Sequence, residues 1–343
     1  MTPLELGDEL DALIRAKIDD PVLIMGPSGI GKSQIVRQVF DKHGMEMCDV
    51  RWGQLSPVDA RGCPVIDREA KITEFYPPSF WPRKGPAGIF LDEINMASTA
   101  MLGLAQQLLL DRQFGDYRVP DGVVVWAAGN RKVDRAFVNE IPAPVKNRVA
   151  HYQVEPDLPS WELWAFSTGI DSRIIGFLKW RPEMLHKFNP DSEVDAWPSP
   201  RTWHMAHRRL QAGMSVEPVV GECAVEFDAY LSMVEQLPNI EAIAEGKGQR
   251  LKFPEEPSIK YACVSGLTSM SLKDWPTYAN CFRWLTTVAV DEPEYCQDFV
   301  MSIIKVLGRS DKKKAAEYMQ QLNQMKEAER FVSEYVAALT AGK

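Results

Sequence analysis

The residues best suited to chemistry form one short stretch, Gly26-Pro27-Ser28-Gly29-Ile30-Gly31-Lys32-Ser33. It fits the pattern G-x-x-x-x-G-K-[ST], in which glycines let backbone N–H groups turn inward and cradle phosphate oxygens. Lys32 would add a positive charge for the β- and γ-phosphates, and the Ser33 hydroxyl would hold Mg²⁺. Residues 21–25 are typical of a buried strand and residues 34–40 of a helix, an arrangement that places phosphates at a helix N-terminus. The motif predicts binding of a nucleoside triphosphate.

Further polar side chains follow the next apolar runs. Asp92 and Glu93 come directly after residues 88–91. A P-loop site needs an acid at a strand end to complete the Mg²⁺ shell, which fits Asp92. Glu93 is then placed to orient or deprotonate the attacking water. Asn130 follows the run 123–128, within reach of a γ-phosphate or that water, although an ordinary turn asparagine is the alternative interpretation.

Two arginines are candidates for stabilising charge on phosphoryl oxygens, a task for which arginine is well suited. Arg148 follows the turn-rich residues 142–144, and Arg201 begins a predicted helix after a loop. A surface salt bridge is the usual role of a single arginine. These residues alone therefore leave their function open.

The elements that must position these residues are those of an α/β fold. Helical periodicity predicts helices at 4–18 and 96–111. The runs at 88–91 and 123–128 look buried on both faces, as in a parallel sheet covered by helices. Strands are predicted at 21–25, 45–52, 88–91, 123–128 and 149–154. The first part of the chain thus predicts a doubly wound parallel sheet.

The remaining sequence contains two inserts in the α/β region and a switch to helical patterns after Glu155. Turn chemistry predicts small hairpins, giving inserts at about 57–78 and 112–122 of a nucleotide-binding domain over residues 1–155. Helical patterns dominate after Glu155, and we divide them into a helical domain at 156–215, which the resemblance below implies is a lid, and a C-terminal extension at 216–343. The last helix is expected from Ser310 or Asp311 to about Leu339.

Composition limits the function classes. The chain has 343 residues, a formal net charge of −8 and six cysteines without a C-x-x-C pair. The acidic balance disfavours a broad nucleic-acid surface. The scattered cysteines suggest free thiols, not a disulfide framework or a zinc site. No apolar run is long enough to span a bilayer, and the acidic N-terminus lacks a signal-peptide core, so we expect a cytoplasmic protein without a membrane partner.

The order of these motifs resembles an AAA+ ATPase, and within that superfamily the MoxR-like group. The stretches that carry the resemblance are Ser56-Pro-Val-Asp-Ala-Arg-Gly62, Pro78-Ser-Phe-Trp-Pro82, Ile89-Phe-Leu-Asp-Glu-Ile-Asn95, Gly115-Asp-Tyr-Arg-Val-Pro120 and Ala127-Ala-Gly-Asn-Arg131 with Asp134-Arg135. The match covers about residues 20–215 well and the C-terminal helices loosely. It implies an AAA+ P-loop core followed by an α-helical lid.

The resemblance also implies roles. Residues 26–33 resemble Walker A, Asp92 and Glu93 resemble Walker B, and Asn130 resembles sensor 1. Arg148 resembles the arginine finger that reaches a neighbouring subunit's nucleotide, and Arg201 resembles sensor 2 on the lid. The inserts resemble loops that line a central pore or face a partner.

These roles imply a Mg²⁺-dependent ATPase that assembles as a homo-oligomer, with a hexameric ring expected. MoxR-like ATPases often act with a von Willebrand factor A domain protein, so such a protein and a protein client are the expected partners. Two other functions stay open. One is a nucleic-acid-directed motor like the related restriction-type GTPases, and the other is a nucleotide-gated scaffold without turnover. The sequence does not separate ATP from GTP.

Overall fold

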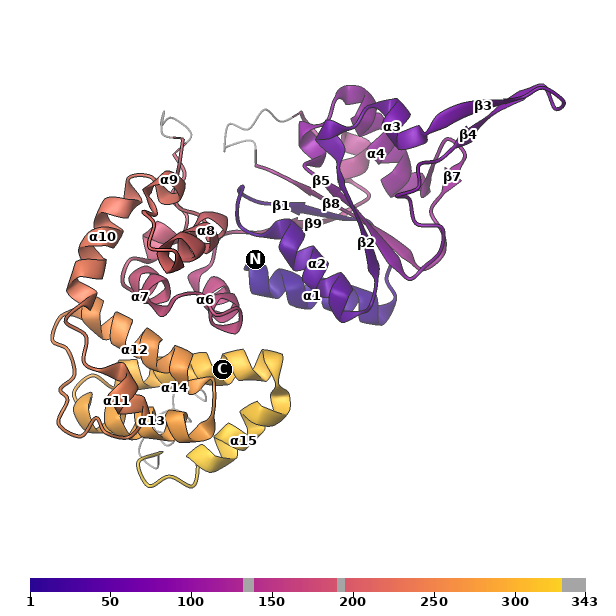
Figure 1. Cartoon of the computed structure of the whole chain (residues 1–343). Helices are drawn as coiled ribbons and strands as arrows, with labels where there is room; N and C mark the ends of the chain where they lie inside the picture. Colours follow the sequence, from indigo (N-terminus) through magenta and orange to yellow (C-terminus); the bar gives the residue numbers. More distant parts are fainter. Residues whose placement is uncertain (132–138, 190–194, 329–343) are drawn as a thin grey trace. The chain divides into compact units, whose positions relative to one another are not determined.

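The chain forms two compact units in a computed structural model that describes residues 1–131, 139–189 and 195–328. The α/β unit is built on Met1–Asp157. The helical unit is built on Leu158–Lys187 and on the later part of the chain. Figure 1 shows the elements of each unit.

A five-stranded parallel sheet forms the centre of the α/β unit. Its order is β2 (Glu46–Arg51), β5 (Ala87–Asp92), β8 (Val123–Gly129), β1 (Val22–Met25) and β9 (Ala150–Gln153). All five predicted strands are therefore confirmed, with ends shifted by a few residues. Because parallel strands end at the same edge, the loops after β1, β5 and β8 meet there. β8 lies between β1 and β5, so Asn130 follows the strand that separates the P-loop from Asp92.

Helices cover both faces of this sheet, as the doubly apolar strands require. On one face, α1 (Pro3–Ala16) and α2 (Lys32–Lys42) pack on a core in which Phe40 stacks against Trp126 with ring centroids 4.8 Å apart. On the other face, α4 (Thr99–Asp111) and α5 (Ala143–Lys146) pack on a second core. The predicted helix at 96–111 begins later than expected. Residues Ile94–Met96 form a separate 3₁₀ turn, η2, and Ser98 caps α4 by accepting a hydrogen bond from Met101 N.

Both predicted hairpins are present. β3 (Cys63–Asp67) and β4 (Ile72–Tyr76) pair antiparallel after the short helix α3 (Pro57–Arg61) and project from the body of the α/β unit (Figure 1). β6 (Gln113–Phe114) and β7 (Tyr117–Arg118) form the second hairpin. Trp81 packs against Phe114 and Tyr117 at its base, with centroid distances of 5.3 and 5.6 Å. Phe75 N donates to Asp116 Oδ2 at 2.7 Å, so the two hairpins are joined directly.

The helical unit confirms the predicted change of character after Glu155. Its described helices are α6 (Leu158–Ser167), α7 (Ser172–Trp180), η4 (Pro182–Leu185), α8 (Pro200–Gln211), α9 (Glu217–Val220), α10 (Cys223–Val234), α11 (Ile240–Ala244), α12 (Pro257–Ser271), α13 (Trp275–Val288), α14 (Pro293–Ser310) and α15 (Lys312–Leu322). The helices α7 and α12 cross closely at Gly176, where a Cβ atom would lie 2.8 Å from Ala262 Cα. Within the described parts of the chain, no helix is both long and apolar enough to cross a membrane.

A buried lysine joins three helices of this unit. The side chain of Lys179 in α7 is 7% exposed, and its Nζ donates to Glu162 Oε1 of α6 at 2.9 Å and to Asp298 Oδ1 of α14 at 2.6 Å. Ser302 Oγ donates to the same Glu162 oxygen at 2.7 Å. Burial raises the pKa of the Asp298 carboxyl, and the attraction to Lys179 offsets this only in part.

The prediction for the last helix was wrong about its length. Asp311 caps α15 by accepting a hydrogen bond from Lys314 N at 2.9 Å, as expected. The helix ends at Leu322 and not near Leu339, because the chain then makes tight turns in which Met325 N donates to Leu322 O and Ala328 N to Met325 O. The rest of the predicted helix, from residue 329, lies outside the described residues.

Candidate nucleotide-binding site

The P-loop connects β1 to α2 at the carboxyl edge of the sheet. Gly31 is the N-cap of α2 with φ 93°, a left-handed conformation that favours glycine. A Cβ on Gly26 would lie 2.5 Å from Val154 O, so the start of the loop also requires glycine. The loop thus presents helix N-terminal N–H groups to an anion, as the motif predicts.

Lys32 is held against the loop, with 8% of the residue exposed. Its Nζ donates to Gly26 O at 2.8 Å, to Pro27 O at 2.9 Å and to Asn130 Oδ1 at 3.1 Å. The ammonium therefore links the P-loop to the residue after β8. These three acceptors are neutral oxygens, which a phosphate oxygen can replace as a stronger, charged acceptor.

Ser33 and Asp92 meet across the sheet edge. Ser33 Oγ donates to Asp92 Oδ2 at 2.5 Å, although the two residues are 59 positions apart. Asp92 Oδ1 accepts a hydrogen bond from Glu93 N at 2.9 Å, which fixes the carboxylate at the end of β5. A hydroxyl and a carboxylate oxygen are hard ligands of the kind Mg²⁺ binds alongside substrate phosphates, so this pair fits the ion.

Glu93 begins the η2 turn in an unusual backbone conformation. Its φ is 54° and its ψ 35°, a left-handed geometry that costs a non-glycine residue about 1–2 kcal/mol. The residue is half-buried directly beside Asp92. A strained backbone of this kind at a strand end is common where a side chain is held for function.

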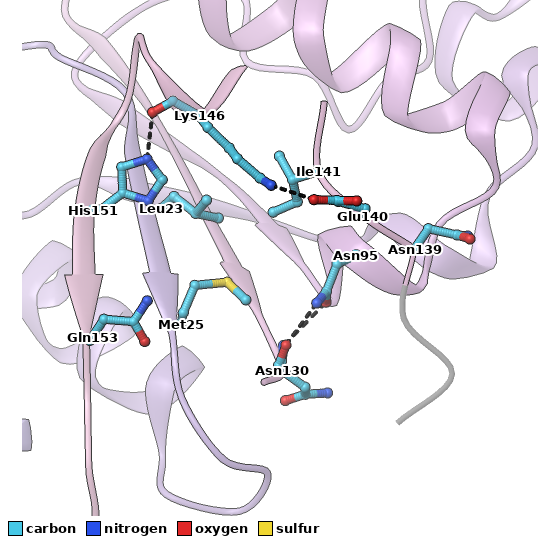
Figure 2. A pocket seen from close by; sticks show the side chains of 10 residues that line it. All are labelled: Leu23, Met25, Asn95, Asn130, Asn139, Glu140, Ile141, Lys146, His151 and Gln153. Atoms are coloured by element: carbon cyan, nitrogen blue, oxygen red, sulfur yellow. Dashed lines mark hydrogen bonds and ion pairs between the residues drawn. The ribbon is translucent and has the colours of Figure 1, made fainter. Parts of the chain in front are cut away.

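Asn95 is a site residue to which the sequence assigns no role. It lies in η2, is 3% exposed, and its side chain binds the backbone of Asn130 twice, as Figure 2 shows. Asn95 Nδ2 donates to Asn130 O at 2.7 Å, and Asn130 N donates to Asn95 Oδ1 at 3.1 Å. The signal in the sequence is that Asn95 ends one of the stretches that carry the resemblance, Ile89-Phe-Leu-Asp-Glu-Ile-Asn95.

The two candidate arginines lie elsewhere. Arg148 is exposed in the turn between α5 and β9, and its guanidinium has no hydrogen-bond or ion-pair partner among the described residues. Because Ala150 pairs with Val22 and Gln153 with Met25, Arg148 precedes the amino end of β9. The four strand residues alone span about 13 Å, so Arg148 and its own P-loop lie at opposite edges of the sheet. Arg201 is the exposed second residue of α8, in the helical unit.

A pocket of about 360 Å³ adjoins Asn130 on the α5 side of the sheet (Figure 2). Its apolar walls include Leu23, Met25 and Ile141. Its polar lining is occupied in part by internal contacts, since Lys146 Nζ donates to Glu140 Oε1 at 2.8 Å and Lys146 O lies 2.6 Å from His151 Nε2. The sequence did not predict this pocket.

Comparison of the sequence with protein-family models and with curated proteins gives no match. Among solved structures, NtrX from Brucella abortus matches with a TM-score of 0.39 and 14% identity, covering 86% of this chain and 67% of that one. A mutant of RuvB from Thermotoga maritima matches with a TM-score of 0.39 and 14% identity, covering 81% of this chain and 85% of that one. NtrX in complex with ATP has a TM-score of 0.38, 14% identity, and coverage of 82% and 67%. Values this low describe a distant likeness of chain path and say nothing of what this chain binds.

Proposed function

We propose that this chain is a Mg²⁺-dependent ATPase of the AAA+ type that acts as an oligomer. The observation that carries the proposal is the pair of contacts Lys32–Asn130 and Ser33–Asp92, which join the ends of three neighbouring strands around one phosphate-binding loop. The P-loop N–H groups and Lys32 would bind the phosphates. Ser33 and Asp92 would hold Mg²⁺, which neutralises phosphate charge when bound.

Hydrolysis would use the residues beside this pair. Glu93 accepts a proton from water as the water oxygen attacks the terminal phosphorus, and the bond from that phosphorus to the bridging oxygen breaks to leave ADP and phosphate. Asn130 orients the water through its side-chain amide. Arg201 would stabilise charge on the phosphates from the lid.

Arg148 supports a site that is completed by a second copy of the chain. It is exposed and precedes β9 at the edge of the sheet opposite its own P-loop, farther than an arginine side chain extends. A neighbouring subunit's P-loop is therefore the site that Arg148 would serve, as the resemblance to an arginine finger implies. We expect a hexameric ring.

Subunit mixing tests this arrangement. Arg148→Ala should keep ATP binding and lower phosphate release by about 10³–10⁵-fold, the size of an arginine-finger effect. Glu93→Gln should also be inactive. A mixture of the two variants should regain activity, because an Arg148→Ala subunit keeps its own Glu93 and receives Arg148 from a Glu93→Gln neighbour.

The control is Arg250→Ala, which removes an exposed arginine of the helical unit. It should leave turnover unchanged. Activity in the mixture equal to the average of the two variants would mean that Arg148 acts within its own subunit or not at all.

We further propose that hydrolysis remodels a partner protein in the cytoplasm, in the manner of MoxR-like ATPases working with a von Willebrand factor A domain protein. The projecting β3–β4 hairpin supports a contact with a client, because Ile66 is 72% exposed, Tyr76 60% and Ile72 51%.

A pull-down with the Glu93→Gln variant and ATP should retain the client, and a pull-down with the Lys32→Ala variant should not. Turnover stimulated by DNA or RNA and lost with salt would instead support a nucleic-acid motor.

A further inference from the structure

We propose that Asn95 is a positioning residue that holds Asn130 in place for hydrolysis, an inference that rests on the proposed function. The side chain of Asn95 acts as a strand-like partner for the backbone at residue 130. Its amide donates to Asn130 O at 2.7 Å and accepts from Asn130 N at 3.1 Å. Both backbone polar groups of Asn130 are therefore satisfied by one side chain, just beyond the end of β8 (Figure 2).

The surroundings of this contact are buried and closely packed. Asn95 is 3% exposed, so its two hydrogen bonds are shielded from water. A Cβ on Gly129 would lie 2.8 Å from Asn95 Oδ1, so the preceding residue must be small for the amide to approach. The contact consequently fixes the direction in which the Asn130 side chain leaves the sheet.

Asn95 also links the carboxylates at the end of β5 to the residue that follows β8. It follows Asp92 and Glu93 by a few residues, while Asn130 Oδ1 accepts the hydrogen bond from Lys32. The turn that contains Asn95 receives a third segment, because Asn139 N donates to Asn95 O at 2.6 Å and Asn139 Nδ2 to Ala97 O at 2.8 Å. That segment leads into α5 and Arg148. This turn follows Asp92 and Glu93 in the chain, and it binds both Asn130 and the segment that leads to Arg148.

A double-mutant cycle separates positioning from simple stabilisation. Asn95→Ala should bind ATP within about threefold of the parent and lower kcat by about 10- to 100-fold, since a shift of about 1 Å at a reacting group has effects of this size. Asn130→Ala should lower kcat as well. The double variant should match Asn130→Ala within about threefold, because Asn95 acts only through the side chain that has been removed. Losses that multiply in the double variant would overturn the inference.

Hydrogen exchange gives a readout that does not depend on turnover. The amide of Asn130 should exchange faster in Asn95→Ala than in the parent, while amides of residues 124–127 in β8 stay protected. An unchanged rate at residue 130 would overturn the inference. A parent protein without any hydrolysis would instead contradict the proposed function, and the exchange result would still decide whether Asn95 holds residue 130.

Asn280→Ala is the matched control. Asn280 is also partly buried, and its Nδ2 donates to Ala244 O at 2.9 Å in the helical unit. It should lower stability but leave kcat unchanged. Should Asn95→Ala fail to fold, Asn95→Asp keeps the shape and loses the donor to Asn130 O, and it is expected to show the same loss in kcat and the same cycle.

Discussion

Two lysines of this chain differ in the acceptors that the described residues show for them. Lys32 in the α/β unit is 8% exposed and donates to two backbone carbonyls and one amide oxygen. Lys179 in the helical unit is 7% exposed at its side chain and donates to two carboxylates, Glu162 and Asp298. Burial of a lysine is therefore no guide to its role. The acceptors around it are informative, because a neutral oxygen yields to an incoming anion and a carboxylate repels one.

The largest expected effect comes from removing Lys179. Lys179→Met leaves the largely buried Glu162 and the half-buried Asp298 without their cation, which should lower the free energy of unfolding by up to about 3–5 kcal/mol. Urea unfolding measures it, with Lys313→Met as control because Lys313 is 89% exposed. ATP binding by the folded variant should change by less than about threefold. A loss of ATP binding equal to that of a P-loop variant would break the distinction between the two lysines.

Removing Lys32 should instead affect turnover more than stability. Lys32→Ala loses a donor aimed at phosphate oxygens, so phosphate release should fall by about 10²–10³-fold, as for other preorganised donors to developing charge. The free energy of unfolding should fall by about 1–3 kcal/mol, since Gly26 and Pro27 are buried and their carbonyl groups lose a donor. A phosphate-release assay and urea unfolding check the two parts. A large loss of stability with normal turnover would assign Lys32 a structural role.

The pH dependence of stability tests how far Lys179 offsets the burial of Asp298. Burial raises the pKa of Asp298 above its ordinary value of 3.8, so the folded state binds a proton more readily than the unfolded state. This contribution to stability is complete below pH 3.8 and is lost as pH rises through the folded pKa. The stability of the parent relative to Asp298→Asn should therefore decrease from acid toward neutral pH, by less than the effect of Lys179→Met. Urea titrations across this range measure the slope, and a slope of opposite sign would mean that Lys179 outweighs burial.

Salt should produce the smallest effect. Between about 0.05 and 0.5 M NaCl the affinity for ATP should weaken by several-fold, because screening acts on a charged ligand in solution. Exchange of amides in α6, α7 and α14 should stay unchanged, since the buried ion pairs are screened far less. Equal salt sensitivity in both measurements would indicate that the Lys179 cluster is open to solvent.

The sequence predicted features whose signal is local. The buried central strands β1, β5 and β8 appear as apolar runs, the edge strands β2 and β9 carry a weaker pattern but were also found, and the P-loop is a contiguous motif. Residues that depend on distant contacts were missed. Asn95 meets Asn130, which is 35 positions away, and Lys179 meets Asp298, which is 119 positions away, so neither partner could be read from spacing. The apolar stripe after Leu322 resembled a continuing helix, but local i to i+3 turns ended it.

Because Glu93 has a left-handed backbone conformation, selection for stability and selection for activity should favour different residues at this position. A library at this position sorted for thermal stability should enrich glycine and asparagine, which adopt a φ of 54° with less strain than glutamate. The same library sorted for phosphate release should return glutamate, because the others lack a carboxylate to accept the proton. Natural drift toward stability would thus erase activity at this residue first, and retention of glutamate there in a lineage would record selection for turnover.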